Sequence, residues 1–427
     1  MKRRTFVEKS SVGSLGIMSA AYLPNWKQEE TVRIGMIGCG WYGIKLAKAV
    51  MGIEGFELVS LCDIDTEHLK SVADEIEQVQ GSRPKAYAAY QELLDKDNLQ
   101  AVIIASPPHW HALQFIDACQ RGLDIYCCKP LAYDINEGLA MIKAAKEADN
   151  IVQIGFMQRS NVVGDKIRSL IQEGRLGKVH QIGAQIHYNP SPGDPTIQDP
   201  PPSLDWDTWC GPAPKLPYRP SIGHFNWRLE KEYGNGHLVD WGIHYIDYLR
   251  KTMDLGTPHS VQATGDNVAH KGQITTPDTL QVRMDFDTYP MVWNHRMWGT
   301  GDLHPEFNSG YTFYGEEATM YGDFKRLILQ PKGKGKEAET IEVPTPGVLA
   351  KDLINFLEAV QSRDKSHLLC PIEEGFQSTA AVQLAMISYY TQSKIVWDQE
   401  KKTIVNNEQA AKLLARPYRG DYTRPTV

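Results

Sequence analysis

Acidic and imidazole side chains recur at helical spacing in the segment 236–251, where apolar residues follow the period of an α-helix. Asp240 and His244 are four residues apart and so share one helix face, with His237 about one turn earlier. A neutral imidazole can take a proton from a hydroxyl group, and a carboxylate can orient that imidazole. The same side chains could instead form a solvated helix face, or could bind a metal ion. We expect no metal site, because a lysine expected nearby, Lys129, disfavours a cation.

Two loops that follow predicted strands carry further polar side chains. Lys129 comes directly after a predicted strand at 123–127, at the sheet edge where ligands bind in doubly wound folds. In a narrow cleft it could hold a substrate hydroxyl group, although its position alone favours an ordinary surface lysine before a proline turn. The loop after the predicted strand at 101–105 contains Ser106, Pro107, His109 and His111. These residues could contact a cofactor, or they could only begin a helix and pack against it.

A glycine-rich turn is the strongest ligand-binding signal in the chain. Residues 38–43 read Gly-Cys-Gly-Trp-Tyr-Gly, directly after a predicted strand and before a predicted helix. The glycines let the backbone approach a pyrophosphate, which the free N–H groups of the helix N-terminus can bind. Asp63 lies at the end of the second predicted strand. A carboxylate there can bind the hydroxyl groups of the adenosine ribose and would repel the extra phosphate of NADP. The sequence therefore predicts that NAD, rather than NADP, binds at Gly38, Gly40, Trp41, Tyr42, Gly43 and Asp63.

Alternating strands and helices must position these loops. Short apolar runs alternate with helical segments from residue 32 to residue 154, which indicates a parallel sheet covered on both faces. We therefore predict an α/β protein whose first domain, residues 31–155, is a doubly wound Rossmann domain. Its predicted strands are 32–37, 56–61, 85–88, 101–105, 123–127 and 151–154, and its predicted helices are 44–51, 65–79, 110–121 and 134–148.

The pattern changes after Gly155. Residues 188–222 contain ten prolines and should form a long irregular segment, in which Trp206 and Trp209 either pack the loop or stack on a sugar. Residues 156–427 should form a second domain with a mostly antiparallel sheet. Its predicted strands include 280–286, 291–297, 311–314 and 326–329, and its C-terminal helices, 348–361 and 375–392, could pack back on the Rossmann domain.

The N-terminus and the composition bear on where the protein works. Lys2-Arg3-Arg4-Thr5-Phe6 before a weakly apolar stretch is typical of a twin-arginine signal, so we expect a signal and linker at 1–30 and a periplasmic or exported protein. A net charge of −7 without a basic stripe argues against nucleic acid as a partner, and no apolar run is long enough to span a membrane. The seven cysteines include no C-x-x-C spacing, so we expect buried thiols rather than disulfides or a zinc site.

These motifs together resemble those of the Gfo/Idh/MocA oxidoreductase family. The resemblance implies a Rossmann domain and a second α/β domain whose open sheet often makes subunit contacts, hence a homo-oligomer such as a dimer or tetramer. One departure is Cys128, because the family usually has a glutamate there, and this leaves the environment of the neighbouring lysine open. The motifs that carry the resemblance are the glycine-rich turn at 38–43, Asp63, Ser-Pro-Pro-His-Trp-His at 106–111, Lys129-Pro130, and the segment 234–244.

The resemblance also implies roles for particular residues. Lys129, Asp240 and His244 would form the catalytic set, and Lys129 would also contact the cofactor. The imidazole would take the hydroxyl proton, the carboxylate would orient the imidazole or the substrate, and the lysine would stabilise charge on the substrate oxygen. The residues that we expect to line the substrate cleft are Arg159, Trp227, Arg228 and His237.

Three functions fit these expectations. The first is an NAD(H)-dependent oxidoreductase that transfers hydride between a sugar or glycoside carbinol and a tightly bound nicotinamide, because an exported protein has no free NAD pool to draw on. The second is a glycoside hydrolase that oxidises a ring hydroxyl group transiently, eliminates the aglycone, adds water and reduces the ring again. The third is a non-catalytic dinucleotide-binding sensor, against which the intact set of Lys129, Asp240 and His244 argues.

Overall fold

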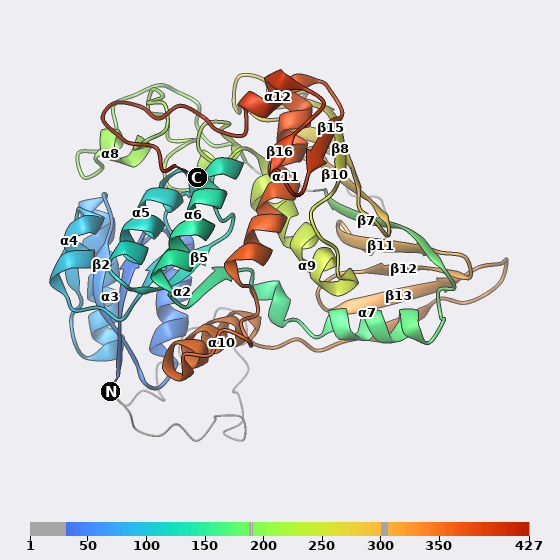
Figure 1. The fold of residues 1–427 in the computed structure, drawn as a ribbon, viewed down its shortest axis with the longest axis horizontal. Helices are drawn as coiled ribbons and strands as arrows, with labels where there is room; N and C mark the ends of the chain where they lie inside the picture. The colour runs from blue at the N-terminus through green and yellow to red at the C-terminus, as the bar shows by residue number, and fades with distance from the viewer. Residues whose placement is uncertain (1–30, 188, 190, 300–305, 427) are drawn as a thin grey trace.

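Two β-sheets organise the chain in the computed structural model, a parallel sheet at the left of Figure 1 and a larger sheet at the right. The predicted fold class, a Rossmann domain followed by an α/β domain with a mostly antiparallel sheet, is confirmed. The predicted export signal at 1–30 lies outside the described residues. The residues that the structure describes are 31–427 except 188, 190, 300–305 and 427.

The first sheet has the strand order β3-β2-β1-β4-β5-β6, and all its neighbouring pairs are parallel. Strands β4, β5 and β6 are buried along their whole length, as their continuous apolar runs predict. Because β1 and β4 lie side by side, the loops that follow them meet at the carboxyl edge of the sheet. The strands are β1 (Val32–Ile37), β2 (Phe56–Cys62), β3 (Lys85–Tyr87), β4 (Ala101–Ile104), β5 (Asp124–Cys128) and β6 (Val152–Gly155).

Local signals explain most helices of this domain. Asp65 caps α3 with its side chain, and Asp134 forms a capping box with Glu137 at the start of α6. Helix α2 begins at Trp41 rather than at residue 44, because the glycine-rich turn leads straight into it. Helix α4 was not predicted, since it is too short to show a clear period. The helices are α2 (Trp41–Met51), α3 (Thr66–Gln80), α4 (Tyr90–Lys96), α5 (Pro108–Gln120) and α6 (Ile135–Ala148).

The second sheet has the order β14-β13-β12-β11-β7-β10-β9-β8-β15-β16, in which β7 and β10 are parallel and the other neighbouring pairs antiparallel. In β10, Met291, Trp293 and His295 are buried and alternate with half-buried residues. The strands are β7 (Val179–His187), β8 (Ser260–Asp266), β9 (Thr279–Asp285), β10 (Pro290–Arg296), β11 (Ser309–Gly315), β12 (Ala318–Gly322), β13 (Arg326–Pro331), β14 (Glu339–Glu342), β15 (Ile395–Asp398) and β16 (Thr403–Ile404).

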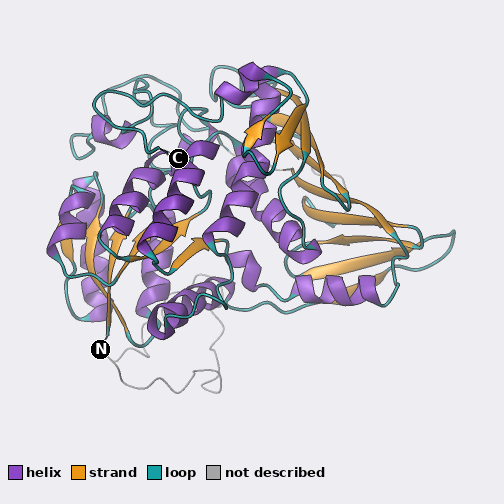
Figure 2. Ribbon diagram, in the orientation of Figure 1, coloured by secondary structure: helices purple, strands orange, loops and turns teal. Residues whose placement is uncertain are grey.

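The remaining helices join the two sheets. Helices α9 and α11 pack against each other and against the second sheet, whereas α10 returns to the Rossmann domain and packs on α2 (Figure 2). Leu353, Phe356 and Leu357 of α10 are buried in the core of that domain. The elements are α7 (Val163–Gln172), α8 (Trp206–Cys210), α9 (Ile243–Met253), α10 (Val348–Ser362), α11 (Ile372–Thr391) and α12 (Glu408–Lys412), with 3-10 turns at Met157–Ser160 and Asn226–Leu229 and a π-helical turn at Leu238–Gly242.

The proline-rich segment, called the arm here (residues 191–225), lies against the Rossmann domain. The carbonyl of Ser203 accepts a hydrogen bond of 3.0 Å from the backbone N–H of Thr66. The indoles of Trp206 and Trp209 stack with ring centroids 4.6 Å apart, and each side chain is 5 % exposed. Tyr233 meets Trp209 edge-on, with centroids 4.8 Å apart. The two tryptophans therefore pack the arm, which is the first of the two alternatives given above.

The C-terminal tail (residues 413–426) lies on the arm. Arg419 donates hydrogen bonds of 3.1 Å from Nε to the carbonyls of Gly211 and Ala213, and its guanidinium pairs with Asp207 at 2.9 Å. Residues far apart in the sequence are thus joined above the carboxyl edge of the parallel sheet (Figure 1).

Candidate active site

The glycine-rich turn between β1 and α2 is tight on the protein side and open on the other. A Cβ atom at Gly38, where φ is +93°, would lie 2.6 Å from the backbone nitrogen of Ser106, and one at Gly43 would lie 2.1 Å from the carbonyl oxygen of Gly38. At Gly40, by contrast, no protein atom lies within 4 Å of the Cβ position. The turn therefore packs β1, β4 and α2 closely while it leaves room for a ligand to approach the backbone at Gly40, as a pyrophosphate requires.

Asp63 is fixed at the end of β2 by the backbone. Its Oδ2 accepts a hydrogen bond of 2.7 Å from the N–H of Cys39, and its Oδ1 accepts one of 3.0 Å from the N–H of Asp65. A carboxylate oxygen has more than one lone pair, so both oxygens can still accept hydrogen bonds from ribose hydroxyl groups. The turn and the carboxylate together fit a dinucleotide, the turn at its pyrophosphate and Asp63 at its adenosine ribose.

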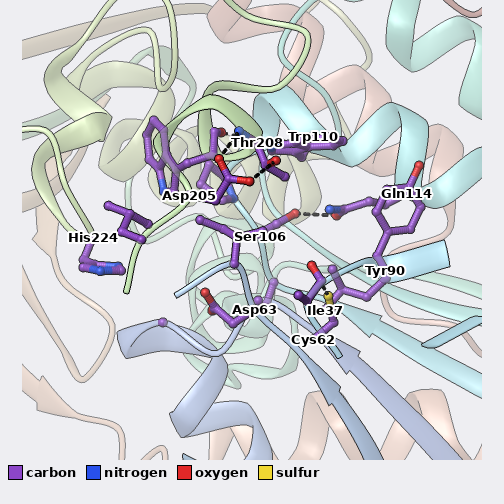
Figure 3. Close-up of a pocket in the computed structure, with 18 of the residues that line it drawn as sticks. Ile37, Cys62, Asp63, Tyr90, Ser106, Trp110, Gln114, Asp205, Thr208 and His224 are labelled. Carbon is purple, nitrogen blue, oxygen red and sulfur yellow. Dashed lines mark hydrogen bonds between the residues drawn. The ribbon is translucent and has the colours of Figure 1, made fainter. Parts of the chain in front are cut away.

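A pocket with a volume of about 600 Å³ lies between this edge of the sheet and the arm. Figure 3 shows Asp63 and Ser106 on the Rossmann side and Asp205 and Thr208 on the arm opposite them. The volume is within the usual range of small-molecule sites. Of the residues predicted to bind the cofactor, those that line the pocket are Gly38, Gly40, Trp41, Tyr42, Asp63, Ser106 and Pro107.

His109 and His111 lie behind the pocket wall. Helix α5 begins at Pro108, so both imidazoles turn into the core, where they are 1 % and 0 % exposed. His111 bridges the carbonyls of Ser106, at 2.8 Å, and Pro130, at 2.9 Å, and thereby joins the two loops that carry the site. Neither imidazole lines the pocket, so their expected contact with the nicotinamide end has no support in this arrangement.

Lys129 and Asp240 come together from the two domains. Lys129 follows β5 and donates a hydrogen bond of 2.8 Å to Oδ1 of Asp240 and another to its backbone carbonyl. Arg228 donates from Nε to the same Oδ1 at 3.2 Å, and Arg228 and Trp227 line the pocket. The side chains of Lys129 and Asp240 are 16 % and 14 % exposed. Two cations and one carboxylate therefore form a partly buried cluster that touches the pocket wall.

Charge and burial set the protonation of this cluster. Burial lowers the pKa of Lys129 below its ordinary value, and Asp240 acts against that shift. Burial alone would raise the pKa of Asp240, but the charges of Lys129 and Arg228 outweigh it and hold this pKa well below its usual range. Asp240 is therefore anionic at neutral pH, and it keeps the two cations in place.

His244, the second residue of α9, lies within electrostatic reach of Lys129 and Asp240. Burial, and then the charge of Lys129, lower the pKa of His244 to about 3. Its Nδ1 is buried and has no hydrogen-bond partner among the described residues. A buried imidazole nitrogen without a protein partner can form a hydrogen bond with a ligand or with water. A neutral His244 can also accept a proton.

The helix that carries Asp240 and His244 is not a regular α-helix, contrary to the prediction for 236–251. A π-helical turn at Leu238–Gly242 precedes α9. A Cβ atom at Gly242 would lie 2.9 Å from the ring of Trp293, so the backbone approaches the second sheet here. Such single π-turns occur often at functional sites. Val239, Ile243 and Ile246 are buried, as expected for the apolar face.

Two predicted substrate residues lie outside the pocket lining. The guanidinium of Arg159 is 3 % exposed and pairs with Asp247 at 2.7 Å and Glu374 at 3.0 Å. His237 is 2 % exposed, its ring centroid lies 5.2 Å from that of His295, and burial lowers its pKa to about 4. Arg159 thus joins helices of the second domain, and His237 lies beneath the turn that carries Asp240.

Several pocket residues were not predicted. Gln114 accepts a hydrogen bond of 2.6 Å from the hydroxyl of Ser106, and Tyr90 lines the pocket beside it. Gln114 could have been found, since it lies about two helical turns after the Ser-Pro-Pro loop. Apart from Trp209, which the sequence analysis named, no local signal indicates the lining residues of the arm and tail, which are Pro202, Ser203, Leu204, Asp205, Thr208, His224 and Tyr422.

Other features of the described chain bear on the site. All seven cysteines are buried and free, as expected, including Cys128 beside Lys129. Within residues 31–426, gaps apart, no group of three or more His, Cys, Asp or Glu side chains could hold a metal ion. No helix in that part of the chain is both long and apolar enough to cross a bilayer.

Comparison with known proteins identifies the family and the fold. Residues 32–156 match the model of an oxidoreductase family with an NAD-binding Rossmann fold, and residues 188–424 match the model of that family's C-terminal α/β domain. Among solved structures, an oxidoreductase from Thermotoga maritima has a TM-score of 0.65 at 18 % identity, over 86 % of this chain and 98 % of that one. Aldose-aldose oxidoreductase from Caulobacter crescentus has a TM-score of 0.66 at 16 % identity, over 86 % and 100 %.

The curated relatives match only part of this chain and only part of their own length. The 2,7-anhydro-N-acetylneuraminate hydratase of Mediterraneibacter gnavus is 25 % identical over 65 % of this chain and 64 % of its own length. Inositol 2-dehydrogenase 3 of Saccharopolyspora erythraea is 28 % identical over 38 % and 46 %, and an alpha-N-acetylgalactosaminidase of Shewanella oneidensis is 29 % identical over 37 % and 36 %. The chain thus matches less than two thirds of the length of these relatives. The two family matches nevertheless cover most of the chain, and the protein belongs to the Gfo/Idh/MocA oxidoreductase family.

Proposed function

We propose that the protein is an NAD(H)-dependent oxidoreductase that acts on a carbinol of a sugar or glycoside. The observation that carries this proposal is the cluster of Lys129, Asp240 and Arg228, which touches the wall of a dinucleotide-sized pocket and has the neutral imidazole of His244 beside it. A proton acceptor and a cation next to a cofactor pocket are what the oxidation of an alcohol requires.

Each side chain has a distinct task in this reaction. His244 accepts the proton of the substrate hydroxyl group, because its lowered pKa keeps it neutral at neutral pH. Lys129 donates a hydrogen bond to the substrate oxygen as negative charge develops there. Asp240 stays anionic and holds Lys129 and Arg228 at the site. When bound, the nicotinamide supplies the acceptor for the hydrogen and the two electrons that leave the same carbon.

The cofactor is proposed to be NAD rather than NADP. Asp63 lines the pocket and is fixed by two backbone N–H groups, so its negative charge would meet a phosphate on the adenosine ribose. The one arginine among the residues lining the described pocket is Arg228, and it is paired with Asp240. The arm faces Asp63 across the pocket (Figure 3), which favours slow release of the cofactor.

A sugar or polyol substrate is supported by the names of the relatives. They include an inositol dehydrogenase and, among the solved structures, an aldose-aldose oxidoreductase. Trp227 and Arg228 at the pocket wall supply an aromatic face and N–H donors, which suit the C–H faces and hydroxyl groups of a sugar.

A second candidate is a glycoside hydrolase that uses bound NAD transiently. It is favoured by the similarity to an alpha-N-acetylgalactosaminidase and to glycosyl hydrolase family 109 proteins of Shewanella, each over 37 % of this chain. The same Lys129, Asp240 and His244 would serve this reaction, because its first and last steps are an oxidation and a reduction at a carbinol. A non-catalytic sensor is a weaker alternative, since the cluster is intact.

We also propose that the chain is exported through Lys2-Arg3-Arg4 and works as a homo-oligomer. Export of a folded protein would explain how a cytoplasmic cofactor reaches another compartment. Replacing Arg3→Lys and Arg4→Lys together should leave the protein in the cytoplasm, as cell fractionation would show, and light scattering of the purified protein measures its mass. Unchanged fractionation would contradict the export proposal.

The test of the main proposal uses the full chain. After extensive dialysis the protein should still carry NAD(H), detected by cofactor fluorescence, and at least one member of a panel of sugars, methyl glycosides and p-nitrophenyl glycosides should reduce bound NAD⁺. His244→Ala should keep the cofactor and lose the reduction. Release of p-nitrophenol without net NADH would favour the hydrolase. An empty, freely exchanging site, or no response to any member of the panel, would contradict the proposal.

A further inference from the structure

Four aromatic side chains in the described part of the chain are unusually exposed, and contacts link three of them to the catalytic residues. Trp41 is 50 % exposed, Phe225 51 % and Trp241 45 %; the fourth is Trp298. A single exposed apolar side chain needs no explanation, but several linked by contacts to one site indicate a binding surface. We call Trp41, Phe225 and Trp241 the aromatic rim.

Printed contacts connect the rim to the reacting groups from both sides. Trp41 and Phe225 meet edge-on with ring centroids 5.9 Å apart. The guanidinium of Arg228 lies 4.8 Å above the ring of Phe225, and its Nε is 3.2 Å from Asp240. On the other side, the ring of Trp241 lies 5.9 Å from that of His244. The three rings are therefore linked by contacts to Arg228 on one side and to His244 on the other.

Cations lie over the rings of Trp41 and Phe225, which remain about half exposed. Lys45 lies 3.8 Å from the ring centroid of Trp41, and Arg228 also stacks on Trp227 at 4.3 Å. Such cation–π contacts orient an aromatic ring at an exposed site. An aromatic face that is already oriented loses little entropy when a ligand ring stacks on it. The aromatic rim is thus a preorganised surface for a flat or ring-shaped group, rather than an interface for a large protein partner.

We propose that the aromatic rim binds the second ring of a glycoside, while the ring to be oxidised lies at Lys129, Asp240 and His244. This inference rests on the proposed function and specifies its substrate class: a sugar joined to another sugar or to an aryl group, rather than a free monosaccharide or polyol. No additional chemical step is involved, since the rim contributes binding only. The second ring is recognised by its apolar face, whatever its identity.

The test compares glycosides of one sugar on the NAD⁺-loaded full chain. In the unmodified protein, kcat/KM for the p-nitrophenyl glycoside should exceed that for the methyl glycoside by about tenfold, mainly through KM, which is the size expected for aromatic stacking. Phe225→Ala and Trp241→Ala should each shrink this ratio by about threefold to fivefold. Turnover is followed by bound NADH absorbance and by release of free sugar, so both proposed reactions are detected.

Controls separate the inference from the proposed function. Leu413→Ala removes an apolar side chain that is 43 % exposed beyond α12, and it should leave the ratio unchanged. Phe225→Leu keeps apolar bulk without a ring, and serves if Phe225→Ala folds poorly. Equal use of the two glycosides by the unmodified protein overturns the inference alone. Faster loss of bound NAD(H) from Phe225→Ala also overturns it, because the rim would then serve the cofactor. Reaction with free sugars but with no glycoside overturns the inference alone, and no reaction with either class overturns the proposed function as well.

Discussion

The two ends of the pocket are built differently. At the adenosine end, Trp209 of the arm is 5 % exposed and stacks on Trp206, and the arm is bound to the Rossmann domain through backbone hydrogen bonds such as that of Thr66 to Ser203. At the catalytic end, Lys129 and Asp240 are partly buried, and the rings of Phe225 and Trp241 are about half exposed. The difference indicates that one end retains a ligand and the other exchanges one.

This comparison follows from how each end is stabilised. Packed aromatic surface and backbone hydrogen bonds must be broken together for the arm to open, so opening is expected to be slow. An exposed ring or a partly buried ion cluster, by contrast, can bind a ligand without disrupting the packing of the hydrophobic core. Retained cofactor and exchanging substrate are the expected consequence, and each can be tested separately.

The largest expected effect is at the catalytic end. Asp240→Asn removes the charge that pairs Lys129 and Arg228 while keeping the size of the side chain. Two cations would then lie together without a counter-charge, and Lys129 would lose the partner that opposes the lowering of its pKa. We expect turnover to fall by about a factor of 10³ with little loss of bound cofactor, measured as single-turnover reduction of bound NAD⁺ and as cofactor content after dialysis.

A matched control for this variant is Asp74→Asn, which removes a carboxylate paired with Arg83 on the surface of α3. Its turnover should be unchanged, because surface ion pairs contribute little. If Asp240→Asn instead emptied the cofactor site and left the turnover of reloaded protein intact, the catalytic end would be misassigned.

The next effect concerns the adenosine end. Trp209→Ala removes a packed indole that also lines the pocket, and it should lower the free energy of unfolding by about 3 kcal/mol and speed the loss of NAD(H) on dialysis. Trp397→Ala, at the far edge of the second sheet, removes an indole that is 3 % exposed and should destabilise the protein similarly without faster cofactor loss. Equal cofactor loss from both variants would mean that general instability, and not the arm, governs retention.

A smaller effect is expected from the C-terminal tail. Tyr422 lines the pocket and meets Trp110 edge-on, with ring centroids 5.5 Å apart. Because Asp63 marks the adenosine side, Tyr422→Ala should weaken the binding of AMP by about fivefold and leave that of nicotinamide mononucleotide unchanged, as calorimetry on cofactor-free protein would measure. Tyr422→Phe keeps the ring and should bind both as the unmodified protein does. If Tyr422→Ala weakened the binding of AMP and of nicotinamide mononucleotide equally, Tyr422 would not act at the adenosine end alone.

The same comparison explains what could be predicted from the sequence. Strands β4, β5 and β6, the turn at Gly38–Gly43 and Asp63 depend on local patterns, because a buried parallel strand is a continuous apolar run and a phosphate-binding turn needs glycine at fixed positions. His109 and His111 follow the same kind of local motif, yet their side chains turn into the core. A motif gives the position of a loop, but the direction of a side chain depends on where the helix begins.

Features that depend on distant contacts were not predictable in this way. Tyr422 reaches the pocket only because Arg419 holds the tail on the arm, and the π-helical turn before His244 depends on how closely Gly242 approaches Trp293. The spacing of Asp240 and His244 predicted one regular helix, whereas Asp240 lies in the π-helical turn and His244 in α9. Packing between domains sets these details.

The smallest expected effect tests whether charge also holds the arm. Asp65 accepts a hydrogen bond of 2.9 Å from His224, whose side chain is 43 % exposed. Burial acts to raise the pKa of Asp65, but hydrogen bonds from the His68 backbone and from His224 outweigh it, so this pKa is lowered. A lowered carboxyl pKa adds stability that is complete above the ordinary value of about 3.9 and is lost as the pH falls through the lowered value.

Asp65→Asn should therefore reduce the free energy of unfolding by less than about 1 kcal/mol at neutral pH, and the difference should vanish in acid below that lowered pKa. The amide oxygen can still cap α3, so the variant isolates the charge. Denaturant unfolding across a pH series measures the difference, and dialysis measures cofactor loss, which we expect to be unchanged. If Asp65→Asn released NAD(H) as fast as Trp209→Ala does, the ion pair rather than aromatic packing would close the adenosine end. High salt and low pH would then also speed the release of NAD(H) from the unmodified protein.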